Sequence, residues 1–126
     1  MLGAKNAAAT LAVTDLDRAR DFYEHTLGLT SPTEMAGAVL YQSGDSRILV
    51  YPSEFAGTNQ ATAATWSAGE DFDAIVGDLR SKGVKFEHYD LPDTTREGDV
   101  HVMGDFRTVW VKDPDGNILN LSSVPA

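Results

Sequence analysis

The 126-residue sequence contains no cysteine, few basic residues and no long apolar run. Disulfides, thiolate nucleophiles and cysteine-ligated metal sites are therefore excluded, and a chain without cysteine suits a reducing compartment, so we expect a cytoplasmic protein. Only 10 Lys and Arg stand against 19 Asp and Glu, for a net charge of −9. Such an acidic chain repels phosphate backbones, which argues against a nucleic-acid partner. No apolar run reaches the about 20 residues of a membrane span, so we expect no membrane partner either.

Two segments carry the apolar periodicity of an amphipathic helix. The first, "TDLDRARDFYEHTLGL" (14–29), begins with Thr14 as the expected N-terminal cap and has Gly28 as the expected left-handed stop. The second, "EDFDAIVGDLRSKGV" (70–84), is expected to stop at Gly83. Its predicted buried stripe consists of Phe72, Ile75, Val76 and Leu79.

The two halves of the chain repeat one pattern. The helix segments recur at an offset of about 55 residues, and "SRILVYPS" (46–53) aligns with "GNILNLSS" (116–123) at an offset of 70. Each half predicts a strand, a helix and about three more strands, and the sheet face without a helix needs a second copy to cover it. We therefore predict a single α+β domain over residues 1–126. It consists of two tandem βαβββ modules, at about 7–53 and 62–124, that form a cupped mixed sheet around a cleft.

The segments "VTDLDRARDFYEHTLGL" (13–29) and "VKDPDGNILNL" (111–121) resemble the vicinal oxygen chelate superfamily. This superfamily includes glyoxalase I, extradiol dioxygenases, and bleomycin- and fosfomycin-resistance proteins. The resemblance implies that the metal-ligand positions of metal-using members fall at Ala8, Val50, Ala64 and Asn120. Alanine and valine donate nothing to a metal, and one neutral amide is a poor anchor. We therefore expect a bacterial-type, glyoxalase-like member that lacks the usual metal ligands, with no metal and no cofactor.

If these four positions face the cleft, the alternation of side chains along each strand predicts the rest of its wall. Leu49 and Tyr51 would then face the helices. The predicted wall is apolar and aromatic with a few polar groups, as small-molecule pockets are. Trp66 and Trp110 either stack on a flat guest, fill the core or cover a dimer interface. The predicted ligand-binding residues are Thr10, Leu40, Gln42, Val50, Trp66, Trp110, Asn120 and Ser122.

A general base is expected on the long segment at 90–105, which often folds over the cleft in the related superfamily. His101, with Asp99 beside it in the sequence, is the predicted base. His25 and His88 are expected to be a surface and a loop histidine. No nucleophile elbow is present.

Three functions remain open on these patterns. The first is a metal-independent protein that binds a small organic molecule for sequestration or transport, as bleomycin-binding relatives do. The second is a metal-independent isomerase, lyase or cyclase that uses His101 or Asp99, and the third is a structural or regulatory module with a vestigial cleft. A glyoxalase-like metal enzyme is a further alternative if the metal-ligand positions have been assigned to the wrong residues. The resemblance also implies a homodimer.

Overall fold

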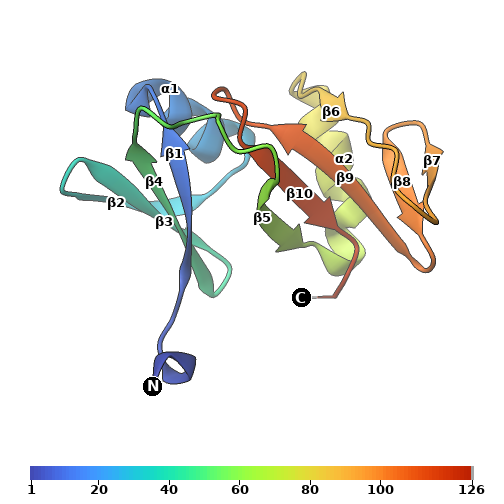
Figure 1. The fold of residues 1–126 in the computed structure, drawn as a ribbon, viewed down its shortest axis with the longest axis horizontal. Helices are drawn as coiled ribbons and strands as arrows, with labels where there is room; N and C mark the ends of the chain where they lie inside the picture. Colours follow the sequence, from blue (N-terminus) through green and yellow to red (C-terminus); the bar gives the residue numbers. More distant parts are fainter. Residues whose placement is uncertain (126) are drawn as a thin grey trace. The chain divides into compact units, whose positions relative to one another are not determined.

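The computed structural model describes residues 1–125 and divides the chain into two compact units (Figure 1). Unit 1 comprises residues 1–63 and the turn Asp113–Asn117, and unit 2 comprises residues 64–112 and the segment from Ile118 onward. Each unit has its own sheet and its own α-helix, so the predicted α+β class is confirmed. Over residues 1–125, none of the helices is long and apolar enough to cross a membrane.

The sheet of unit 1 has the strand order β1-β4-β3-β2. Strands β1 and β4 are parallel, whereas the β4–β3 and β3–β2 pairs are antiparallel. The elements are η1 (Leu2–Ala4), β1 (Ala8–Val13), α1 (Leu16–Arg20), the π-helical segment η2 (Asp21–Thr26), β2 (Thr30–Met35), β3 (Ala38–Ser43) and β4 (Ser46–Pro52).

Helix α1 begins one residue later than expected. Asp15 is the cap, because its Oδ1 accepts the backbone N–H of Arg18 at 3.1 Å. The expected cap, Thr14, donates its backbone N–H and its hydroxyl to Asp115 instead. Gly28 has a φ of +75°, which confirms the predicted left-handed stop.

One face of the unit 1 sheet packs against the helix. The hydroxyl of Tyr41 in β3 donates to Glu24 of η2 at 2.7 Å, and this contact marks the helix-covered face. Tyr41 pairs with Ile48 of β4, and Val39 pairs with Val50. Alternate residues of these strands lie on the opposite, helix-free face. The buried residues of the covered face are Leu11, Val13, Val39, Tyr41, Ile48 and Val50.

The sheet of unit 2 has the order β5-β10-β9-β8-β7, and β6 also pairs with β9. The elements are β5 (Thr62–Ser67), η3 (Gly69–Asp71), α2 (Phe72–Ser81), β6 (Phe86–Glu87), β7 (Thr95–Glu97), β8 (Val100–Met103), β9 (Phe106–Lys112) and β10 (Ile118–Ser122). The segment expected as a long covering loop therefore contains a hairpin, β7–β8, which extends the sheet beside β9.

Helix α2 covers one face of the unit 2 sheet. It buries Phe72, Val76 and Leu79 as predicted, whereas Ile75 is exposed. The guanidinium of Arg107 in β9 lies 5.0 Å from the centre of the Phe72 ring. Arg107, Val109 and Val111 therefore face the helix. Gly83 ends the helix with a φ of +79°, as predicted.

Candidate functional site

The helix-free face of unit 2 carries two rows of side chains across the sheet. Direct cross-strand pairs place Ser122, Thr108, His101 and Arg96 in one row, from β10 through β9 and β8 to β7. Asn120, Trp110 and Glu87 form the neighbouring row. Directly paired residues point to the same face of a sheet, so side chains from five strands share this face.

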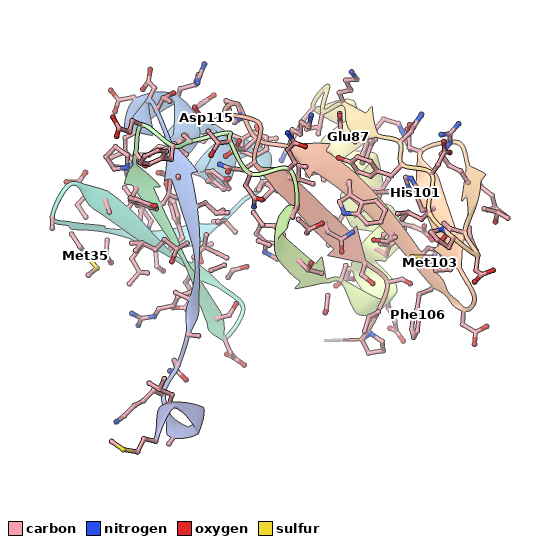
Figure 2. All side chains as sticks on the ribbon, viewed as in Figure 1. Met35, Glu87, His101, Met103, Phe106 and Asp115 are labelled. Atoms are coloured by element: carbon pink, nitrogen blue, oxygen red, sulfur yellow. The ribbon has the colours of Figure 1, made fainter. Side chains whose placement is uncertain are left out.

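His101 lies in the middle of this face and is fully buried, whereas Met103 and Phe106 at the end of the β8–β9 hairpin are exposed (Figure 2). The backbone N–H of Tyr89 donates to Nε2 of His101 at 3.0 Å. Because Nε2 accepts, the neutral ring carries its proton on Nδ1. That buried Nδ1–H has no hydrogen-bond partner among residues 1–125.

Aromatic rings surround His101. Its ring meets Trp110 edge-on, with centroids 4.9 Å apart, and Tyr89 meets Trp110 edge-on at 5.4 Å. We call Tyr89, His101 and Trp110 the Trp110 cluster. The Tyr89 hydroxyl is also buried and lacks a partner in the described part of the chain. An unpaired buried polar group costs about 1–3 kcal/mol. Both groups therefore need hydrogen-bond partners that the described residues do not supply.

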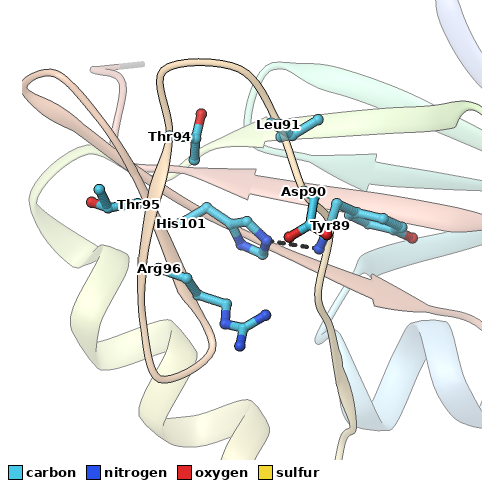
Figure 3. Close-up of a pocket in the computed structure, with 7 residues that line it drawn as sticks. All are labelled: Tyr89, Asp90, Leu91, Thr94, Thr95, Arg96 and His101. Atoms are coloured by element: carbon cyan, nitrogen blue, oxygen red, sulfur yellow. Dashed lines mark hydrogen bonds between the residues drawn. The ribbon is translucent and has the colours of Figure 1, made fainter.

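A pocket of about 240 Å³ opens beside His101 (Figure 3). It lies between strands β7 and β8 and the segment at 89–94 that precedes them. Arg96, the cross-strand neighbour of His101, lines it and forms no ion pair with any residue from 1 to 125. The lining residues are Tyr89, Asp90, Leu91, Thr94, Thr95, Arg96 and His101.

Asp99 does not contact His101. Its carboxylate instead lies 2.8 Å from Nε2 of His88 and 3.1 Å from the Arg80 guanidinium. The hydrogen bond from His88, and then that from Arg80, lower the pKa of Asp99 below its ordinary value. The sequence analysis placed His88 in a loop and missed this pair, because no local spacing links positions 88 and 99.

Three other predicted ligand residues belong to unit 2. Asn120 and Ser122 are buried on the helix-free face, as the alternation predicts, and Trp66 in β5 is half-buried. The Asn120 side-chain amide donates to the Thr108 hydroxyl at 2.5 Å and to the Val109 carbonyl at 3.1 Å. The Ser122 hydroxyl accepts the backbone N–H of Val124 at 3.1 Å.

Of the predicted ligand residues in unit 1, Thr10, Leu40 and Gln42 lie on the helix-free face. The predicted orientation of Val50 is wrong. Val50 is fully buried on the helix-covered face beside Val39, and Leu49 takes the position opposite Leu40. The alignment of the two halves was therefore off by one residue in this strand. The β-branched pair Ile48 and Val50 was the signal, because such residues favour the buried face.

The residues at the expected ligand positions do not fit a metal. Ala8 and Ala64 carry no donor atom, and Leu49, which replaces Val50 on the helix-free face, carries none. Asn120 uses its amide within the sheet. Over residues 1–125, no group of three His, Asp or Glu side chains is arranged to hold a metal ion. A divalent metal needs several imidazole or carboxylate donors at one point, and this donor set offers at most one weak ligand.

Two helix-covered sheets built from a repeated pattern define the class of fold. The family model of the Glyoxalase/Bleomycin resistance protein/Dioxygenase superfamily matches residues 6–121, and the chain belongs to this superfamily. The solved structure of the oxidase ChaP-H1 is similar, with a TM-score of 0.72, 23% identity and 97% of both chains covered. Lactoylglutathione lyase from Agrobacterium tumefaciens has a TM-score of 0.68 and 18% identity, covering 94% of this chain and 92% of that one.

The fosfomycin resistance protein FosX from Mesorhizobium loti is similar as well, with a TM-score of 0.65 and 15% identity over 95% of this chain and 92% of that one. At these identities the neighbours share the fold and do not define the activity. No protein with a curated description matches this sequence.

Proposed function

We propose that the chain is a metal-independent small-molecule binding protein that sequesters or carries an organic compound. The observation that carries the proposal is the buried, unpaired Nδ1–H of His101 beside a pocket and the Trp110 cluster. The lining of this pocket is mostly polar, and convergent polar groups that fix the orientation of a ligand are a feature of small-molecule sites. The residues at the expected metal-ligand positions do not fit a metal, which supports a function that is independent of metal.

The hydrogen bond to His101 favours binding over catalysis. A general base needs a free lone pair within reach of the substrate proton. The lone pair on Nε2 of His101 already accepts the Tyr89 N–H, so the ring nitrogen left without a partner, Nδ1, is a donor. The role supported for His101 is therefore that of a hydrogen-bond donor, in place of the predicted base.

The other expectations from the sequence, on further ligand-binding residues, domain organisation, location and oligomeric state, remain proposals. Trp66 of unit 2, and Thr10, Leu40 and Gln42 of unit 1, remain proposed ligand-binding residues in a chain proposed to be a single domain. We also propose a cytoplasmic homodimer. The superfamily membership is what supports these points.

Two single-tryptophan variants test the binding function. In W66F the only tryptophan is Trp110, and in W110F it is Trp66. Native mass spectrometry and elemental analysis of the purified wild type come first, followed by a compound screen on both variants. We expect a co-purified organic molecule, or screening hits that change Trp110 fluorescence, without stoichiometric metal. An empty mass and no response from a diverse panel would refute the proposal.

A second function rests on the hydrogen bond between His88 and Asp99. A carboxylate that holds one nitrogen of an imidazole orients the other as a base, which is the arrangement of many proton-transfer sites. The imidazole of His88 is partly exposed and so open to a substrate. In this alternative the chain is a metal-independent isomerase, lyase or cyclase. Compounds that bind would then be converted, as followed by mass spectrometry and NMR, and H88Q would abolish conversion while binding persists.

A further inference from the structure

The pocket beside His101 collects hydrogen-bond donors and a positive charge in an otherwise acidic protein. The chain has a net charge of −9, yet the Arg96 guanidinium at this pocket has no ion pair with the described residues. The Nδ1–H of His101, on the adjacent strand, also lacks an acceptor there. The exposed Arg96 guanidinium and the buried Nδ1–H of His101 are both donors, so the group that suits them is an acceptor.

The β7–β8 pairing brings these two donors together. Arg96 and His101 are direct cross-strand partners on one face, and the Cβ atoms of such partners lie about 4.5–5.5 Å apart. A guanidinium recognises the two oxygens of a carboxylate through parallel hydrogen bonds. A third donor, the Nδ1–H, can complete the recognition of one planar anionic group.

The other lining residues limit the rest of the ligand. Leu91 is the aliphatic residue of the lining, whereas the exposed carboxylate of Asp90 opposes additional negative charge (Figure 3). The volume of about 240 Å³ is below the range of about 300–1,000 Å³ that holds drug-sized ligands. The pocket therefore suits one ring and one singly charged group.

We propose that this pocket binds the carboxylate of a small monocarboxylic acid with a flat apolar body, held by Arg96 and by the Nδ1–H of His101. This inference rests on the proposed binding function, because it names the ligand class of that same site.

Benzoate and its neutral analogue benzamide test the proposal in parallel NMR titrations of ¹⁵N-labelled protein. The Tyr89 amide is the reporter, since it donates to His101. We expect benzoate to bind about tenfold more tightly than benzamide, the effect of one charge-assisted hydrogen bond. R96Q removes this preference, whereas K85Q, which removes an exposed charge of unit 2 outside the pocket, retains it.

A second variant separates recognition from folding. In H101Q the side-chain carbonyl can still accept the Tyr89 N–H, while the donor at the Nδ1 position is lost and the glutamine N–H groups lie at the end of the side chain. We expect H101Q to lower the benzoate preference, while the far-UV circular dichroism spectrum shows that the fold is retained. Equal binding of benzoate and benzamide, a preference that survives R96Q, or tighter binding of phenyl phosphate would each overturn the carboxylate site. Those outcomes leave the binding function standing, whereas no response to any of the three probes or to the compound panel would refute both.

Discussion

Replacing Tyr23 by Phe tests how the turn Asp113–Asn117 is held in unit 1. The Tyr23 side chain is fully buried, and its hydroxyl donates to Oδ2 of Asp113 at 2.7 Å. The Asp113 carboxylate also accepts the backbone N–H groups of Asp115 and Asn117 and the side-chain amide of Asn117. The phenol is thus one of four donors to a buried carboxylate.

The expected cost follows from the charge of the acceptor. A hydrogen bond to a charged group contributes about 1.5–3 kcal/mol, and losing it leaves Asp113 less well solvated. The Phe ring fills the same space, so no cavity adds to the loss. We expect Y23F to lower the free energy of unfolding by about 2 kcal/mol. With a urea m-value of about 2 kcal/mol/M, the midpoint falls by about 1 M.

Urea unfolding followed by far-UV circular dichroism measures this change. Y51F is the matched control, because Tyr51 is exposed and its loss of a hydroxyl is expected to change the free energy by less than about 0.5 kcal/mol. If Y23F were as stable as Y51F, the hydrogen bond from Tyr23 would not stabilise the turn and the reasoning would fail.

Three further outcomes follow from the same contacts. Burial, and then the charge of the Asp113 carboxylate, raise the pKa of Tyr23 above its ordinary value of 10.0. The stability that the protonated phenol contributes is therefore present below pH 10 and is lost as the pH rises above 10. In thermal melts, Y23F should show a smaller decline in stability at alkaline pH. Gly57 has a φ of +74°, and an added Cβ would collide with the Asp115 carbonyl. Gly98 has a similar φ of +64°, but an added Cβ would meet no other atom there. We therefore expect G57A to lower the melting temperature more than G98A does. Long-range ¹H–¹⁵N spectra should show His101 protonated on Nδ1, and a proton on Nε2 would contradict the hydrogen bond from Tyr89.

Local signals in the sequence predicted much of the fold. Gly28 and Gly83 end their helices because the left-handed conformation is accessible to glycine at little cost. The apolar stripe of α2 and the alternation in β9 and β10 were correct for nearly every residue, because both reflect burial against one neighbour. The α+β class follows from these local periodicities.

Contacts between distant segments were harder to predict. Helix α1 is capped by Asp15 and not by the predicted Thr14, because Thr14 hydrogen-bonds to Asp115, about 100 residues away in the chain. The hairpin β7–β8 has short strands with mostly exposed residues, so alternation gives little signal. The candidate site depends on this hairpin, which places Arg96 beside His101 and Asp99 beside His88. Neither pair could be predicted from the spacing of these residues in the sequence.

The last prediction concerns Asn120, at a metal-ligand position of the superfamily. In N120D a carboxylate oxygen replaces the amide nitrogen that now donates to the Thr108 hydroxyl and the Val109 carbonyl. Two oxygens then face each other in a buried place, so we expect a loss of about 2–4 kcal/mol at neutral pH, larger than for N120A. Millimolar Zn²⁺ or Ni²⁺ should not restore stability, because Ala8, Ala64 and Leu49 add no donor. Chemical unfolding with and without metal measures both effects. A metal that rescued N120D but not N120A would show that further ligands exist, and the metal-independent function would have to be withdrawn.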